Sequence, residues 1–275
     1  MRQERNMHIA LTACLVLLVC LTVSHQVHAQ ANNEVTRAAP RWPDGRINLG
    51  ALPGEAGLWY RGENYLVINP NSYEPDATMN SRIHIDDLPI KPWALALTNF
   101  RNDLYLGTEP YTRCQPSGGP RHFIAFYGME IMDQPELERV YFFYRAISGS
   151  YRVVYMDGRK HPENMTPGYF GHSIGHWEGD TLVIDTIGMN EKFWMNREGL
   201  PHTEQLHLVE RVTRTNFDSL DYTVTVDDPG AYDSSWTSGM TLRWYPDEQI
   251  SEYICQENNR SPEGMFKYTE SRIVP

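Results

Sequence analysis

The sequence predicts a mainly β protein in which consecutive strands pair as antiparallel neighbours. From about residue 121 onward, short segments rich in β-branched and aromatic residues recur at regular intervals, as strands do. A few turn-forming residues separate several of these segments, which is the pattern of β-hairpins. The chain has 275 residues, of which 41% are hydrophobic and 21% charged, a composition typical of a globular protein and not of a disordered chain.

The first element is a secretory signal over residues 1–29. Two arginines precede a continuous apolar stretch from Ile9 to Val23, and small residues lead up to Ala29. This stretch is shorter than the ~20 residues that a membrane-spanning helix needs. We therefore expect cleavage after Ala29 and a periplasmic or secreted protein with no integral membrane association. A retained membrane anchor is the alternative.

Two further elements precede the strands. Residues 30–57 are rich in Asn, Pro, Gly and Ala and predict an irregular N-terminal arm. The segment Lys91–Arg101 (KPWALALTNFR) predicts one short helix, because it begins beside a proline and contains good helix formers without an internal glycine.

The strands follow at short intervals. They are expected over Arg121–Tyr127, Arg139–Arg145, Tyr151–Met156, Gly175–Trp177, Thr181–Thr186, Leu206–Arg214, Leu220–Val226, Met240–Tyr245 and Ile250–Gln256. Turn signals stand at Asp157–Gly158, Glu178–Asp180, Asn216–Ser219 and Pro246–Glu248.

A long antiparallel meander with few helices closes into a barrel or folds into a sandwich. We predict a single lipocalin-like (calycin-like) β-barrel domain over residues 58–275, and a sandwich with a filled core is the alternative. A set of bulky aromatic residues is expected in the core, and some of them line a ligand cavity if the barrel is hollow. These residues are Tyr141, Phe142, Phe143, Tyr144, Tyr151 and Tyr155.

The cysteines divide into two pairs. Cys14 and Cys20 lie in the predicted signal, which leaves Cys114 and Cys255. In an oxidising compartment this even pair predicts a disulfide that braces the closure of the barrel, with Cα atoms within roughly 7 Å of each other. A metal-binding pair or a reactive thiol is the alternative, although no CxxC motif favours a metal.

Charge and motifs exclude several classes of function. The formal net charge is −11 and there is no run of lysine or arginine, so the surface repels nucleic acid. The sequence contains no GxSxG, GxGxxG, GxxxxGK[ST], HExxH or EF-hand motif. We therefore predict no nucleotide cofactor and no nucleic-acid partner; the expected partner is a small, partly apolar molecule.

Histidines gather in one part of the chain. Five of the seven histidines that follow the signal fall between residues 161 and 211. They are His161, His172, His176, His202 and His207. Alternation along the strands puts His207 on one face and Glu210 on the other. Asp185 stands in an apolar strand, so its carboxylate must face solvent or have a partner, for which a histidine is suited.

Two chemical interpretations of this region remain open. In the first, an acid–base site, three histidines converge with a carboxylate: His172, His202 and His207 with Asp185, Glu204 or Glu210. His207 is the first candidate for general base or acid, and Asp185 or Glu210 orients its ring. In the second, the same three histidines bind a divalent zinc or iron ion. A structural role, with histidines bonded to backbone groups at a hairpin rim, is the alternative to both.

Six motifs follow one another along the chain: Pro40–Gly45 (PRWPDG), Met156–Pro162 (MDGRKHP), Gly171–Val183 (GHSIGHWEGDTLV), Pro201–Arg211 (PHTEQLHLVER), Val226–Pro229 (VDDP) and Glu252–Asn258 (EYICQEN). In this order they resemble a large group of exported bacterial proteins of unassigned function. The resemblance covers residues 40–260 and implies export and a single domain, but no activity. It departs from the pattern at Asn48, at Trp59, and at His176, where Arg or Lys is usual; the last departure weakens His176 as a catalytic residue or ligand.

Together these features predict an exported enzyme that performs proton-transfer chemistry, as a lyase, isomerase or hydrolase. Its substrate is a small, partly apolar molecule held in the barrel cavity, and the acid–base cluster acts on it. A non-catalytic, lipocalin-like carrier of a hydrophobic ligand is the alternative, and a structural envelope protein is a third class.

Overall fold

The structure, a computed structural model, describes residues 37–61, 66–67, 83–104, 107–123, 127–145, 150–257 and 259. The chain divides into two compact units, of which the first, residues 1–36, lies outside the described residues. The predicted signal and its cleavage site therefore also lie outside them. In the described part of the chain, no helix is long and apolar enough to span a membrane.

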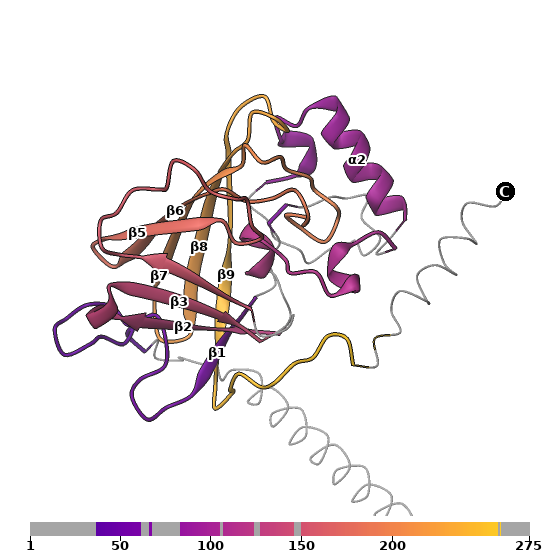
Figure 1. The fold of residues 1–275 in the computed structure, drawn as a ribbon. Coiled ribbons are helices and arrows are strands. Elements are labelled where there is room, and N and C mark those ends of the chain that lie inside the picture. The colour runs from indigo at the N-terminus through magenta and orange to yellow at the C-terminus, as the bar shows by residue number, and fades with distance from the viewer. Residues whose placement is uncertain are drawn as a thin grey trace, which may run out of the picture. The chain divides into compact units, whose positions relative to one another are not determined.

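The second unit is built on a closed β-barrel, which confirms the predicted fold class and excludes the sandwich (Figure 1). The barrel strands are β1 (Gly57–Arg61), β2 (Met129–Gln134), β3 (Arg139–Tyr144), β4 (Tyr151–Tyr155), β5 (His172–Glu178), β6 (Thr181–Ile187), β7 (His207–Arg214), β8 (Ser219–Asp227) and β9 (Trp236–Pro246). Each strand pairs with its neighbours in sequence, and β1 pairs with β9 to close the barrel.

One α-helix accompanies the barrel. The helix α2 (Pro92–Asp103) confirms the helix predicted over Lys91–Arg101, and a proline begins it as expected. Figure 1 shows α2 beyond one end of the strands. Short 3₁₀ turns complete the described elements: η1 (Ile85–Asp87), η2 (Pro110–Arg113), η3 (Gly119–His122) and η4 (Pro135–Leu137).

The connection after β4 corrects one predicted hairpin. Gly158 has a positive φ of 72°, so the chain does turn at Asp157–Gly158. The next residues do not return as a strand, since Pro162 and Pro167 lack the N–H that a sheet ladder needs. The crossover segment, residues 156–171, instead leads to β5, which pairs with β4 in parallel. All other strand pairs of the barrel are antiparallel.

The strand predicted over Arg121–Tyr127 is also wrong in its described part. Residues Gly119–His122 form the 3₁₀ turn η3, which Pro120 favours because its fixed φ suits the first helical position. The side chain of Phe123 then enters the barrel, where its ring stacks on Tyr222 with centroids 3.8 Å apart. Residues 124–126 lie outside the described residues.

The barrel closes differently from the prediction. Residues 250–256 form no strand, so the predicted fourth hairpin is wrong: after β9 the chain turns away at Asp247, which has a φ of 65°. The partner of β9 is β1, with Leu58 opposite Tyr245 and Trp59 opposite Trp244. The sequence pattern missed β1, which lies apart from the regular series of hairpins, and β2, which forms a hairpin with β3.

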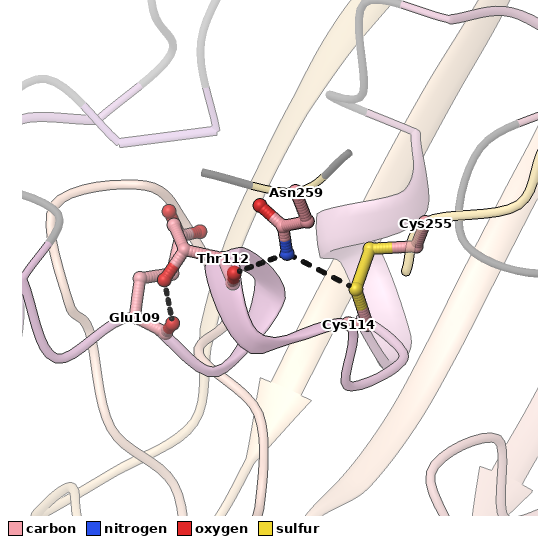
Figure 2. The surroundings of a disulfide bond; sticks show 5 residues. All are labelled: Glu109, Thr112, Cys114, Cys255 and Asn259. Carbon is pink, nitrogen blue, oxygen red and sulfur yellow. Dashed lines mark hydrogen bonds between the residues drawn. A yellow bond between two sulfur atoms is a disulfide. The ribbon is translucent and has the colours of Figure 1, made fainter. Parts of the chain in front are cut away.

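The predicted disulfide is present. Cys114 and Cys255 are bonded with Cα atoms 5.6 Å apart, within the expected distance (Figure 2). Cys114 follows the turn η2, and Cys255 lies in a turn after the last strand, so the bond ties the C-terminal segment to η2 and does not brace a closing strand. Asn259 donates hydrogen bonds to the carbonyl oxygen of Thr112 (3.1 Å) and to Cys114 Sγ (3.3 Å).

Polar and aromatic side chains pack together inside the barrel. Phe142 and Tyr144 of β3 are buried there, as predicted. The other four aromatic residues that were predicted in the core are not buried. Those face outward and are half-buried or exposed: Tyr141, Phe143, Tyr151 and Tyr155. The interior also holds Arg152 of β4, whose guanidinium forms a buried ion pair with Glu210 of β7.

Candidate acid–base site

The candidate site lies on the outer face of the neighbouring strands β4 to β7. Side chains along a strand point alternately to the two faces of a sheet. The structure separates the two faces as alternation predicts: Ile184 and Leu208 are buried inside, whereas Asp185 and His207 face outward and not into the barrel cavity where the site was expected. His172, at the start of β5, also faces outward, next to the buried Ser173.

These outward side chains meet in a hydrogen-bonded group with a fourth residue, His161. His207 Nε2 lies 2.9 Å from Asp185 Oδ1, and His161 Nε2 lies 3.0 Å from the same oxygen. His161 Nδ1 in turn lies 2.8 Å from His172 Nδ1. We call His161, His172, Asp185 and His207 the His–Asp cluster.

His161 reaches the cluster from the crossover segment. Strand alternation gave no position for it, because it lies between the strands predicted over Tyr151–Met156 and Gly175–Trp177. Two signals did mark it: its place among the five gathered histidines and its place in the MDGRKHP motif. In the structure its imidazole is mostly buried, with 15% of the side chain exposed, against 37% for His207 and 41% for Asp185.

The contacts determine which ring nitrogens carry protons when all three histidines are neutral. An ionised carboxylate only accepts hydrogen bonds, so His161 and His207 both donate from Nε2 to Asp185. His161 Nδ1 must then accept, which makes His172 Nδ1 the donor. The nitrogens left without a proton are His172 Nε2 and His207 Nδ1, and each is available as a base.

His172 is held in its neutral form. Burial, followed by the positive charges of His161 and Arg159, lowers the pKa of His172 below its ordinary value. A histidine with a lowered pKa is unprotonated at neutral pH, which is the state that a general base needs.

Tyr155 borders the cluster on the side of β4. Its ring stacks with the imidazole of His172 at a centroid distance of 5.2 Å. The Arg159 guanidinium lies over the same ring, 3.9 Å from its centroid. The cluster therefore has an aromatic side chain and a cation at its edge.

His202, which the sequence also predicted in the site, does not join the cluster. It is buried under Phe193, whose ring centroid is 4.1 Å away, and both of its ring nitrogens meet backbone carbonyl oxygens. Nε2 lies 3.1 Å from the oxygen of Phe193 and Nδ1 lies 3.3 Å from that of Thr203. Burial lowers the pKa of His202. This histidine fastens two loop segments together, as the structural interpretation expected of such residues.

The two glutamates among the predicted partners lie apart from the cluster. Glu210 faces the barrel interior, where its carboxylate accepts hydrogen bonds from Arg152 and from Tyr222 Oη (2.9 Å). The carboxylate and hydrogen bonds of Glu210 outweigh the burial of Arg152 and raise the pKa of Arg152. The side chain of Glu204 is exposed. Of the predicted carboxylates, the structure brings only Asp185 to the histidines.

The metal interpretation finds no support in this geometry. The three histidines predicted as ligands do not converge, because both ring nitrogens of His202 are engaged with the backbone. Among the described residues, no group of three or more His, Cys, Asp or Glu side chains is arranged to hold a metal ion.

Comparison of the chain with protein-family models, with curated proteins and with solved structures finds no significant match in any of the three. The resemblance to exported bacterial proteins stays a prediction from the motifs.

Proposed function

We propose that the His–Asp cluster is the acid–base site of an exported enzyme that acts on a small, partly apolar molecule, as a lyase, isomerase or hydrolase. The observation that carries the proposal is the position of His161 between Asp185 and His172. A carboxylate that orients one imidazole, which in turn orients a second, fixes the tautomer of the terminal base.

In this proposal His172 is the general base. Its Nε2 takes a proton from the substrate, and the imidazolium that results still donates its Nδ1–H to His161. The positive charge is stabilised through His161 by the negative charge of Asp185. The lowered pKa of His172 supports this role, since the ring is free to accept a proton at neutral pH.

His207 is the second acid–base group. It donates to the same Asp185 oxygen as His161, and 37% of its side chain is exposed. Asp185 stabilises positive charge on the His207 ring when that ring is protonated, so His207 returns a proton to the product. The sequence placed His207 first as base or acid; the geometry supports His172 as the base with His207 as its partner.

The site faces outward and not into the barrel. The interior is occupied by the Arg152–Glu210 ion pair and by stacked rings such as Phe123 on Tyr222. The partly apolar substrate instead meets the aromatic side chain of Tyr155 beside the cluster. The disulfide supports export, because such bonds persist in oxidising compartments.

The proposal is tested by a turnover screen in D₂O with panels of esters, lactones and enolisable carbonyl compounds. Mass spectrometry reads both hydrolysis and deuterium uptake. We expect the wild-type chain to turn over a compound and His172→Gln to lose about 10²–10⁴-fold of that rate. His176→Gln is the matched control, since His176 lies on the same strand and is 64% exposed. Equal rates for wild type and His172→Gln on every compound would overturn the proposal.

A further inference from the structure

A row of cations and rings continues from the cluster across β4 and β3. Tyr155, which stacks on His172, lies directly opposite Arg139 of β3 in the strand register. The Arg139 guanidinium is 5.5 Å from the centroid of the Tyr155 ring, and that of Arg159 is 3.9 Å from it. Two arginines therefore flank the aromatic residue that borders the proposed base.

The charge of Arg139 is not neutralised by the described part of the chain. The only hydrogen bond of its guanidinium to a described residue is a long one of 3.4 Å from Nη1 to Tyr141 Oη, and the guanidinium forms no ion pair with a described residue. Arg159 differs, because Asp157 accepts from its Nε and Nη2. Arg139 thus carries a positive charge that has no counter-ion among the described residues, in a protein whose formal net charge is −11.

Aromatic side chains extend this row along the outer face. Tyr141 and Phe143 of β3 stack with centroids 5.8 Å apart, and Phe143 lies 6.1 Å from Tyr151 of β4. Tyr151 is 55% exposed. Flat rings at a sheet surface bind other rings well, because both partners bury area without losing much conformational freedom.

We infer that the substrate of the His–Asp cluster is a ring that bears a carboxylate, with the carboxylate on Arg139 and the ring against Tyr141 and Tyr155. This inference rests on the proposed function for the reaction, but the binding that it describes is separate from turnover. A guanidinium recognises a carboxylate through two parallel N–H donors, and among the described residues the Arg139 guanidinium donates only from Nη1, in the long bond to Tyr141 Oη. The ring lies next to His172 because Tyr155 does.

Two kinds of ring acid share this chemistry, aromatic acids and uronic acids. Each has a neutral counterpart of nearly equal shape. Binding of benzoate is therefore compared with that of benzamide, and binding of galacturonate with that of galactose. The ring signals of His172 report binding by NMR in the full chain.

We expect at least one acid to shift the His172 signals and to bind about tenfold more tightly than its neutral counterpart. The variant Arg139→Gln should bind that acid about tenfold more weakly than the wild-type chain does. Arg211→Gln is the control, because it makes the same change in net charge on the outer face of β7, where Arg211 pairs with Glu178. Circular dichroism of both variants verifies the fold.

The outcomes separate this inference from the proposed function. Equal binding of acids and neutral counterparts, or no loss in Arg139→Gln, overturns the substrate class even if His172→Gln abolishes turnover. If an acid binds through Arg139 while His172→Gln leaves turnover unchanged, the catalytic proposal fails and the binding inference holds. Benzoate binding alone assigns an aromatic acid, and galacturonate binding alone assigns a uronic acid.

Discussion

Nδ1 of His161 lies 2.8 Å from Nδ1 of His172, so one proton serves two imidazole rings. Each ring has a different environment on its far side: His161 meets the carboxylate of Asp185, and His172 stacks on Tyr155. The shared proton therefore makes the two ends of the pair different. The negative charge of Asp185 lies at the His161 end, and the unprotonated Nε2 lies at the His172 end.

The first prediction concerns the titration of His172. Burial is the first cause that lowers its pKa and the charge of His161 is the next, so His161→Gln should raise the pKa of His172 toward its ordinary value. NMR titration of the ring protons of His172 in the wild-type chain and in the variant measures this. An unchanged or lower pKa of His172 in the variant would show that the charge of His161 does not lower it.

Asp185→Asn should reduce turnover by about 10²–10⁴-fold, because an amide cannot stabilise the positive charge that builds up on His161 and His207. The same variant should leave the melting temperature nearly unchanged, since 41% of the Asp185 side chain is exposed. Parallel measurements of rate and melting temperature separate a chemical role from a structural one. A loss of rate that only follows a loss of folded protein would count against the cluster.

The buried histidines should make stability depend on pH. Burial lowers the pKa of His122 and of His202 in the folded chain, so below about pH 6.5 the unfolded chain binds protons that the folded chain does not. Stability is therefore complete above pH 6.5 and falls as the pH falls below it, with a slope of up to about 1.4 kcal/mol per pH unit for each histidine. Urea unfolding at pH 7.5 and 5.5 checks this, and His122→Phe should flatten the slope.

Breaking the ion pair inside the barrel should be costly. Glu210→Gln leaves the Arg152 charge buried without its counter-ion, and we expect a loss of about 3–5 kcal/mol in the free energy of unfolding. The double variant Arg152→Met/Glu210→Leu removes both charges and should lose less than Glu210→Gln alone. Denaturant unfolding of both variants measures the difference, and the opposite order would show that the pair is not coupled.

Removing the disulfide should lower stability without opening the barrel. The bond joins residues 141 positions apart, for which the chain-entropy model gives about 4–5 kcal/mol. The double variant Cys114→Ser/Cys255→Ser should melt at a lower temperature but keep its far-UV circular dichroism, since β1 and β9 close the barrel by backbone hydrogen bonds. Loss of the β signal at room temperature would mean that the bond is needed for folding itself.

Local patterns were sufficient for most of the barrel. Alternation and turn residues predicted the hairpins of β5 with β6 and β7 with β8, and they put His207 and Glu210 on opposite faces. They did not predict that Asp185 and His207 face outward. The same rules missed β1, whose partners β2 and β9 lie far away in the sequence, and no short-range signal reports such pairing. They also missed β2, although it forms a hairpin with β3. They also predicted a strand at residues 250–256. That segment forms no strand, because β1 already pairs with β9 and the closed barrel has no free edge strand there.

The candidate site was predictable only in part, because its parts come from two kinds of structure. Strand alternation located His207 and Asp185, but His161 arrives through the crossover segment, whose path depends on the parallel pairing of β4 and β5. His202 was predicted as a site residue only because it lies close in sequence to the other histidines. Whether a loop histidine turns toward a strand face or into the core depends on packing, here against Phe193, which the sequence pattern does not contain.

The bond between Cys114 and Cys255 makes one covalent ring of everything between them, and that ring contains β2 to β9 together with the whole His–Asp cluster. A protease that cuts a single peptide bond within the ring releases no fragment, because both halves stay joined through the sulfur atoms. A nicked chain of this kind keeps its two pieces at a high effective concentration, so the strands of the barrel can stay paired after the cut.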